Sequence, residues 1–459
     1  MNQLQALEQA GTAPALHTDG SGWVDHAALA AMADAAVAAL LPRSLLALQF
    51  RPTLAAVSVY LGALRNGHVP LLLDSQLDPG LQQRLLVHFG VKHVFDGQQW
   101  LPGPAAGPAP LLHPALALLM STSGSTGSPK LVRLTLANLQ ANAESIVQYM
   151  ALSPDDRAIS SLPLHYSYGL SVLNSHLVAG AAVVLADDAV TSEAFWTCMR
   201  AHGVTSLSGV PTTWRMLRRL RFERMGLPAL RRMTQAGGRM DRDDVQWLAG
   251  VAAATGRQLF VMYGQTEATA RIAYLPPAQA AAKPDSIGTA IPGGRLHLRD
   301  EQGAVIDADG VEGELVYQGP NVMMGYAQQP TDLAEGPGPD LLPTGDLAVR
   351  DADGHYRISG RRSRFVKLFG NRFGLDEVEQ QLREQGLEAA ATGRDDCLMI
   401  GLVGSDAQAQ ALQRSLASQY RVHPSAIVVR TLPALPRNSA GKLLHAELLA
   451  RLSEAATVP

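Results

Sequence analysis

The sequence predicts an α/β fold: a large N-terminal domain of mostly parallel sheets flanked by helices, a small β-rich subdomain, and a small α+β C-terminal domain. Helical and strand-like segments alternate over residues 1–100, which is typical of βαβ units. Short alternating strands follow in residues 287–330. A polar break at residues 360–364 then precedes about 100 residues with apolar strands and helices of their own, a common domain size. We therefore expect two domains, residues 1–360 and 361–459.

The composition describes a compact soluble protein. Of 459 residues, 47% are hydrophobic and 17% charged, and the net charge is −3 from 38 basic and 41 acidic residues. This balance gives no reason to expect a nucleic-acid or anionic-membrane partner. The two cysteines, Cys198 and Cys397, argue against a disulfide framework or a cysteine zinc site. Without a secretory signal or a membrane-spanning run, we expect a cytoplasmic enzyme.

Four segments carry the alternation in the first 100 residues. Apolar residues at helical spacing predict helices over Ala27–Leu41 and Thr53–Asn66, and apolar runs predict strands at Leu45–Phe50 and Val69–Leu73. Prolines and glycines at residues 102–110 predict a surface loop. These segments read as the first βαβ units of the large domain.

Later segments continue the same alternation. Thr135 is the predicted N-cap of a helix whose apolar residues recur three and four apart as far as Met150. Strands are predicted at Val183–Leu185 and Ser206–Pro211. Arginines between residues 217 and 232 are read as a solvated helical face, with a docking patch for coenzyme A phosphate or an acidic carrier protein as the alternative.

A loop of hydroxyl side chains, glycines and one lysine occupies residues 121–130, between two predicted strands. Gly124 and Gly127 let successive backbone N–H groups turn into one concavity that binds anions, and Lys130 adds a positive charge. A Walker A loop differs, because it has four residues between its glycines and a lysine directly after the second. The loop therefore predicts phosphate binding, with a flexible Ser/Gly linker as the alternative.

Ser123–Lys130 resembles the phosphate loop of the adenylate-forming superfamily, which includes acyl-CoA synthetases, adenylation domains of peptide synthetases and luciferases. Leu131 stands where that family usually has glycine. Further segments between Ala115 and Lys442 resemble motifs of the family in the same order, and Tyr263-Gly264-Gln265-Thr266-Glu267 is among the more specific. The resemblance implies ATP and Mg²⁺ as cofactors and activation of a carboxylic acid as acyl-AMP.

The resemblance also implies roles for individual residues. As catalytic residues, Thr266 would contact the α-phosphate, Glu267 would bind Mg²⁺ through its carboxylate, and Lys442 would act between the incoming carboxylate and the α-phosphate. Tyr263 offers a face for stacking, and Asp346 offers a carboxylate that can accept two hydrogen bonds from ribose. The ATP- and AMP-binding residues implied are Thr122, Ser123, Gly124, Ser125, Thr126, Gly127, Lys130, Gly237, Gly238, Tyr263, Gly264, Asp346 and Arg361.

The same resemblance implies that residues 361–459 form a mobile domain. The family has a Gly-Arg-x-Asp segment at its hinge, and here Ser363 takes the place of the aspartate. Lys367 and Gly370 lie in the segment implied to line the thiol channel. We therefore expect two half-reactions with a rotation of the C-terminal domain between them.

The acyl pocket is expected around Leu162–Leu170, where the family carries a Pro-x-x-His-x-x-Gly-like segment. Either His165 or Tyr166 takes the position of that histidine. The absence of aspartate between Pro163 and Ala186 disfavours an α-amino acid, and the polar and aromatic side chains suggest a small aromatic or polar acid. The predicted pocket residues are His165, Tyr166, Tyr168, Ser171 and Asn174.

Three functional interpretations stay open at this point. The first is a ligase that transfers the acyl group to coenzyme A. The second is a stand-alone adenylating enzyme that loads the phosphopantetheine of an acyl carrier protein. The third is a non-catalytic nucleotide-binding protein, against which the presence of both Glu267 and Lys442 argues.

Overall fold

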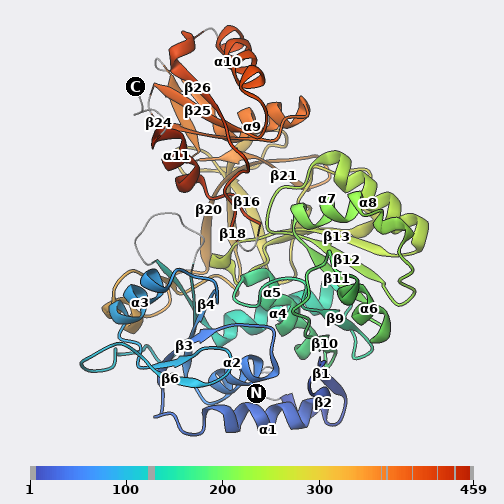
Figure 1. Ribbon diagram of the computed structural model, residues 1–459, viewed down its shortest axis with the longest axis vertical. Coiled ribbons are helices and arrows are strands. Elements are labelled where there is room, and N and C mark those ends of the chain that lie inside the picture. Colours follow the sequence, from blue (N-terminus) through green and yellow to red (C-terminus); the bar gives the residue numbers. More distant parts are fainter. Residues whose placement is uncertain are drawn as a thin grey trace. The chain divides into compact units, whose positions relative to one another are not determined.

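The computed structural model describes residues 7–121, 130–362, 364–368, 371–394, 396–420, 422–438 and 441–454 (Figure 1). The chain forms two compact units. Among the described residues, the first comprises 7–121, 130–296 and 317–342, and the second comprises 297–316 and the residues from 343 onward. The boundary expected at residue 360 stays a prediction.

A seven-stranded sheet in the first unit has the order β19-β8-β7-β4-β3-β5-β6. Its centre is parallel, because β3 pairs in parallel with β4 and β5, and β4 with β7. The two strands predicted at Leu45–Phe50 and Val69–Leu73 are both present. The strands are β3 (Leu45–Gln49), β4 (Val69–Leu73), β5 (His93–Phe95), β6 (Trp100–Pro102), β7 (Leu116–Ser121), β8 (Leu131–Thr135) and β19 (Gly325–Ala327).

A nine-stranded sheet in the same unit has the order β15-β14-β13-β12-β11-β9-β10-β1-β2. From β1 to β13 along this order the neighbours are parallel, as the βαβ alternation predicts. The strands are β1 (Pro14–Thr18), β2 (Gly22–Asp25), β9 (Arg157–Ile159), β10 (Ala182–Val184), β11 (Ser206–Gly209), β12 (Arg232–Gln235), β13 (Gln258–Tyr263), β14 (Ala273–Leu275) and β15 (Thr289–Ala290).

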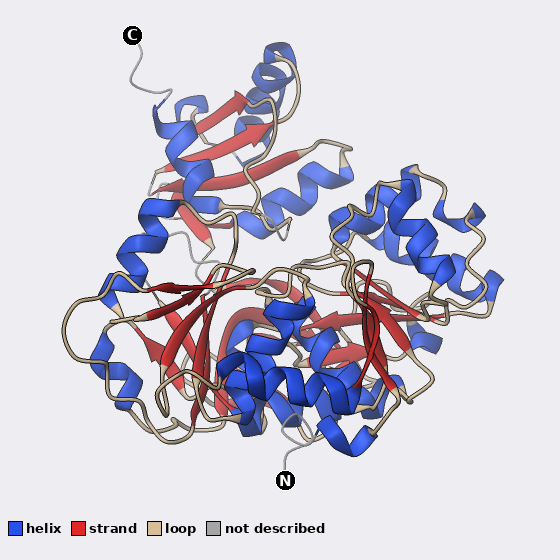
Figure 2. Cartoon of the chain, turned by 60° about the horizontal axis from the view of Figure 1, so that its bottom comes forward, coloured by secondary structure: helices blue, strands red, loops and turns tan. Residues whose placement is uncertain are grey.

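Helices lie between and beside these two sheets (Figure 2). One apolar core joins Leu139 of α4 and Leu170 of α5 to Leu118 of the seven-stranded sheet and Val183 of the nine-stranded sheet. The helices of this unit are α1 (His26–Val37), α2 (Leu54–Arg65), α3 (Pro79–His88), α4 (Leu136–Met150), α5 (Ser167–Val178), α6 (Glu193–Ala201), α7 (Pro211–Arg219) and α8 (Arg242–Thr255). The predicted α/β fold is confirmed.

The second unit holds most of a five-stranded sheet of order β17-β16-β18-β20-β21, a three-stranded sheet β24-β25-β26 and the hairpin β22-β23. The strands are β16 (Arg295–Arg299), β17 (Val305–Ile306), β18 (Glu312–Gln318), β20 (Leu341–Arg350), β21 (Tyr356–Arg361), β22 (Phe365–Leu368), β23 (Asn371–Gly374), β24 (Ala389–Arg394), β25 (Cys397–Leu402) and β26 (Ile427–Thr431). The helices are α9 (Leu375–Glu384), α10 (Asp406–Tyr420) and α11 (His445–Glu454).

Short 3₁₀ helices complete the described chain. They are η1 (Leu7–Ala10), η2 (Phe222–Arg224), η3 (Thr266–Ala268), η4 (Pro277–Gln279), η5 (Pro330–Ala334) and η6 (Pro424–Ala426). Within the described ranges, none of the helices has the length and apolar character that a membrane crossing requires.

Candidate active site

A tyrosine links two of the predicted nucleotide-site residues in the first unit. Strand β19 pairs antiparallel with β8 and sets Tyr326 opposite Val132, close to Lys130, the residue before β8. The Lys130 Nζ lies 3.5 Å from the centroid of the Tyr326 ring, and the Tyr326 hydroxyl donates a 2.8 Å hydrogen bond to Glu267 Oε1. Burial raises the pKa of Tyr326, and the charge of Glu267 raises it further, so this hydroxyl stays a donor at neutral pH.

Glu267 lies on η3, which begins three residues after the last residue of β13. The backbone N–H of Met323 donates to the Glu267 carbonyl oxygen at 2.8 Å, and the Thr266 hydroxyl lies 3.3 Å from that of Ser167. A β-carbon on Gly264 would lie 1.6 Å from the carbonyl oxygen of Ala270, so the backbone leaves room only for glycine here. This close approach fixes how the strand turns into the segment that presents Thr266 and Glu267.

Gly237 and Gly238 follow β12. Gly237 has a φ of +83°, and a β-carbon there would lie 2.6 Å from the Tyr166 hydroxyl. The structure thus brings Tyr166, a predicted pocket residue, against a predicted nucleotide-site glycine. At the end of β13, the Gln265 amide donates to the Tyr263 hydroxyl at 3.3 Å.

The segment before α5 separates the two histidine candidates. The His165 Nε2 lies 3.5 Å from Asp74 Oδ2, and burial lowers the pKa of His165 although the charge of Asp74 raises it. Burial raises the pKa of Tyr166 to about 12. The Tyr168 hydroxyl lies 2.7 Å from that of Thr234. Burial also raises the pKa of Tyr168. His165 and Tyr166 therefore contact different parts of the first unit.

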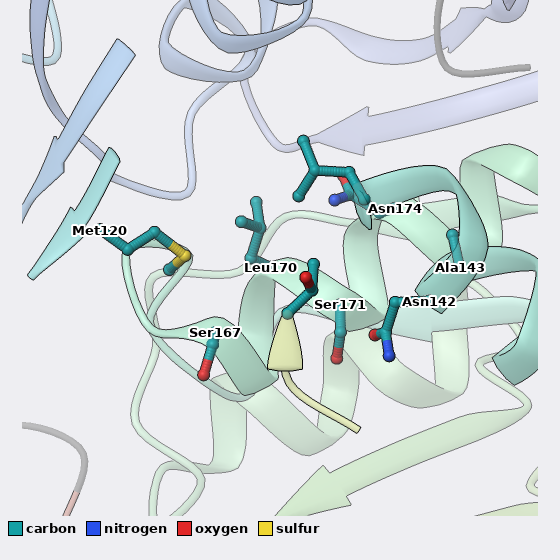
Figure 3. A pocket seen from close by; sticks show the side chains of 9 residues that line it. Met120, Asn142, Ala143, Ser167, Leu170, Ser171 and Asn174 are labelled. Carbon is teal, nitrogen blue, oxygen red and sulfur yellow. The ribbon is translucent and has the colours of Figure 1, made fainter. Parts of the chain in front are cut away.

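Ser171 and Asn174 line a small cavity of about 10 Å³, close to the room needed by one water molecule. Figure 3 shows them on α5, with Asn142 and Ala143 on α4 nearby. Ser171 donates to the Tyr168 carbonyl oxygen at 2.7 Å, and Asn174 exchanges hydrogen bonds with the Tyr60 hydroxyl at 3.0 and 3.1 Å. In this state both side chains bond within the protein.

In the second unit, Asp346 on β20 pairs with Arg361 on β21. The Arg361 Nε donates to Asp346 Oδ1 at 2.8 Å, and the carboxylate side chain is 4% exposed against 44% for the arginine. The Asp346 N–H donates to the Thr344 hydroxyl at 3.1 Å. Asp346, predicted to bind ribose, and Arg361, predicted to bind the nucleotide, are therefore in direct contact.

Lys442 is exposed at a tight turn of the second unit. Its N–H donates to Asn438 Oδ1 at 2.8 Å, and its carbonyl oxygen accepts from the Asn438 N–H at 2.9 Å. Gly441 supports the turn with a φ of +74°. Several other predicted residues lie outside the described residues: Thr122, Ser123, Gly124, Ser125, Thr126, Gly127, Ser363 and Gly370, and the side chain of Lys367.

Sequence reasoning missed two residues of this region, Tyr326 and Arg271. Arg271 is 3% exposed, and its guanidinium carbon lies 4.2 Å from the centroid of the Tyr168 ring. Its signal in the sequence is a single charge within the otherwise uncharged stretch Ala268–Leu275. Tyr326 had no such signal, because its contacts depend on the pairing of distant strands.

Some arginines of the proposed docking patch have structural partners. Arg218 forms an ion pair with Asp244 at 2.6 Å, and Arg231 and Arg232 both pair with the buried Asp156, at 2.8 and 2.5 Å. These contacts give three of the arginines structural partners, but Arg232 is buried on β12 and so does not belong to the predicted solvated helical face.

Comparison with known proteins gives consistent results. A model of the family described as AMP-binding enzyme matches residues 96–327. Sulfoacetate–CoA ligase of Cupriavidus necator is 34% identical over 75% of this chain and 69% of its own length. L-proline–[L-prolyl-carrier protein] ligase of Pseudomonas fluorescens is 29% identical over 72% of this chain and 67% of its own. The structure of O-succinylbenzoate coenzyme A synthetase from Bacillus subtilis with ATP and magnesium ion has a TM-score of 0.78 at 23% identity, covering 98% and 99% of the two chains.

Proposed function

The chain belongs to the AMP-binding enzyme family, and we propose that it is an ATP-dependent acid–thiol ligase with coenzyme A as acceptor. It converts a carboxylic acid to acyl-AMP with release of pyrophosphate, then transfers the acyl group to the thiol. The observation that carries the proposal is the contact chain from Lys130 through Tyr326 to Glu267. It joins the residue that ends the phosphate loop to the predicted metal ligand.

The chemistry explains why such residues are needed. A thiol cannot displace oxide from a carboxylate at a useful rate. In the first step a carboxylate oxygen bonds to the α-phosphorus as the bond to pyrophosphate breaks. In the second, the thiol loses its proton, its sulfur bonds to the acyl carbon, and AMP leaves. The first step depends on positioning and charge neutralisation, which we assign to Lys130, Thr266 and Lys442.

Glu267 fits the role of a Mg²⁺ ligand. Carboxylate oxygens suit this hard cation, and the Tyr326 hydroxyl bonds one oxygen, Oε1, which orients the group. When bound, Mg²⁺ neutralises charge on the phosphates. Glu267 accepts the hydrogen bond that the Tyr326 hydroxyl donates. Thr266 presents its hydroxyl beside that of Ser167.

The acyl pocket is proposed on the side of Gly237 where Tyr166 lies. The closeness of the Tyr166 hydroxyl to Gly237 favours Tyr166 over His165 for contact with the acid. Asp346 and Arg361 are proposed to bind ribose, since their side chains already form one hydrogen-bonded pair. We further propose that residues 361–459 move about Ser363 between the two steps.

The test is pyrophosphate release by the purified chain with ATP and Mg²⁺ over a panel of aryl, short-chain, hydroxy and amino acids, with hydroxylamine to trap acyl-AMP. We expect one class of acid to stimulate release, Lys442→Ala to abolish it, and Lys92→Ala, another exposed lysine, to leave it unchanged. If ATP binds but no acid stimulates release, the ligase proposal fails.

A carrier protein is the second candidate acceptor, favoured by the similarity to the L-prolyl-carrier protein ligase. Once an acid is known, acyl transfer to free coenzyme A is compared with transfer to a phosphopantetheinylated carrier protein. Turnover with coenzyme A supports the first acceptor. Acylation of the carrier without turnover of coenzyme A would replace it with the second.

A further inference from the structure

Arg271 is a buried cation that no acidic side chain neutralises within the described part of the chain. It lies between η3 and β14, is 3% exposed, and forms none of the ion pairs found among the described residues. Its Nε is buried and has no hydrogen-bond partner. Burying an arginine in this way is unfavourable, because the charge loses water without gaining a counter-charge. Such a group is set up to receive an anion.

The surroundings of Arg271 are aromatic. The guanidinium lies over the ring of Tyr168, and its charge acts on the hydroxyls of Tyr149 and Tyr166. Burial nevertheless raises the pKa of both Tyr149 and Tyr166 to about 12, so neither supplies a negative charge at neutral pH. These rings provide cation–π contact and hydroxyl groups around the guanidinium, but no counter-ion.

The backbone holds Arg271 in place. Its carbonyl oxygen accepts hydrogen bonds from the side-chain amides of Asn142, at 3.3 Å, and Asn321, at 2.8 Å. Arg271 also follows Glu267 by only four residues, across the loop whose close approach at Gly264 fixes its path. The backbone of Arg271 is therefore held in place, and its guanidinium lies over the Tyr168 ring, in the region proposed to hold the acid.

We propose that Arg271 binds a second anionic group of the acid substrate, a carboxylate or sulfonate distinct from the carboxylate that is activated. The inference rests on the proposed function and narrows it to acids with two anionic groups. The planar fork of an arginine matches the oxygens of such a group in a bidentate arrangement. The tyrosines would border the part of the acid between its two charged ends.

The first experiment uses the unmodified chain and matched pairs of acids: succinate with its monomethyl ester, phthalate with its monomethyl ester, and 3-sulfopropionate with 3-(methylsulfonyl)propionate. We expect the member with two anionic groups to be preferred by about 10- to 100-fold in kcat/KM for pyrophosphate release, the range for a hydrogen-bonded charge. An equal or better result with the neutral partner in every pair overturns the inference, while leaving the ligase function in place.

Two variants then assign the preference to Arg271. Arg271→Gln should raise KM for the acids with two anionic groups and leave their neutral partners nearly unchanged, and Arg271→Lys should restore part of the preference. Arg257→Gln is the control, since Arg257 also lies over an aromatic ring, 5.9 Å from that of Phe222, outside the proposed site. Equal losses for both members of each pair would mean that Arg271 binds the activated carboxylate, and would overturn the inference.

A binding measurement separates the inference from the proposed function. Each acid of a pair is added to the unmodified chain and the melting temperature is recorded without turnover. Stabilisation by the acids with two anionic groups, absent in Arg271→Gln, supports the inference even if pyrophosphate release fails. If the Arg271→Gln chain does not fold, the matched pairs on the unmodified chain decide alone, and no difference between partners overturns the inference.

Discussion

At the residue scale, the Tyr326 hydroxyl is expected to orient Glu267 without touching the nucleotide itself. Tyr326→Phe keeps the ring that Lys130 contacts but removes the hydrogen bond to Glu267 Oε1. Mutation of a residue that orients a metal ligand typically lowers metal affinity or activity by about 10- to 100-fold. We expect a loss of this size in pyrophosphate release, with a higher Mg²⁺ concentration needed for half-maximal rate.

Tyr317→Phe is the matched control for this substitution. The Tyr317 hydroxyl is also buried, and it donates to Asn321 Oδ1 at 2.7 Å. Its loss should lower stability and leave the Mg²⁺ dependence unchanged. Identical Mg²⁺ titrations for Tyr326→Phe and the unmodified chain would show that Tyr326 does not position a metal ligand.

The sequence predicted Lys130 and Glu267 as site residues, but not Tyr326, which lies between them. Lys130 and Glu267 belong to segments whose composition or resemblance pointed to phosphate and metal binding. Tyr326 is 59 residues from its partner Glu267, so only the folded chain shows that they meet. The same holds for Tyr166 and Gly237, which local pattern placed in two separate motifs.

At the scale of one helix, α4 begins with a reciprocal cap that the sequence predicted in part. The Thr135 hydroxyl accepts from the Asn138 N–H, and the Asn138 side chain accepts from the Thr135 N–H, both at 2.9 Å. Thr135→Ala should therefore lower the free energy of unfolding by about 1 kcal/mol, measured by urea denaturation. Gln148→Ala, at an exposed position of the same helix, should change it by less than about 0.5 kcal/mol. Equal effects would exclude the cap as the cause.

Helix α5 contains a buried histidine that makes stability depend on pH. Burial lowers the pKa of His176 to about 4, from 6.5, and its Nε2 has no hydrogen-bond partner. The unfolded chain therefore binds a proton between pH 6.5 and pH 4 that the folded chain does not. The stability from neutral His176 is present above pH 6.5 and is lost as the pH falls toward 4, by at most about 3 kcal/mol.

His176→Leu should flatten the decline in the free energy of unfolding between pH 6.5 and pH 4. His88→Leu, which replaces an exposed histidine, should retain it. Urea denaturation at several pH values measures both slopes. An unchanged slope in His176→Leu would assign the pH dependence to other groups.

Local patterns predicted the elements well and their arrangement less completely. The strands expected at Leu45–Phe50 and Val69–Leu73 are present because apolar runs and turn residues act over a few positions. The order of the two large sheets depends on contacts between distant residues, such as β19 beside β8. The hydrophobic periodicity of the sequence does not reveal this strand order.

At the scale of the whole molecule, the proposed mechanism requires two half-reactions that use different residues of the C-terminal segment. Lys442→Ala should abolish formation of acyl-AMP, because its charge is assigned to the carboxylate and the α-phosphate. Thioester formation from supplied acyl-AMP should stay largely intact. Gly370→Trp should have the reverse effect, since a large side chain there would obstruct the predicted thiol channel. Single-turnover assays of each step measure both.

The comparison of the two variants decides whether the steps are separable. A static site that serves both reactions would lose both rates with either substitution, because the same side chains would surround the acyl group throughout. A C-terminal segment that turns about Ser363 would present Lys442 for one step and the neighbourhood of Gly370 for the other. Opposite losses in the two assays therefore support domain rotation, and parallel losses would contradict both it and the role assigned to Lys442.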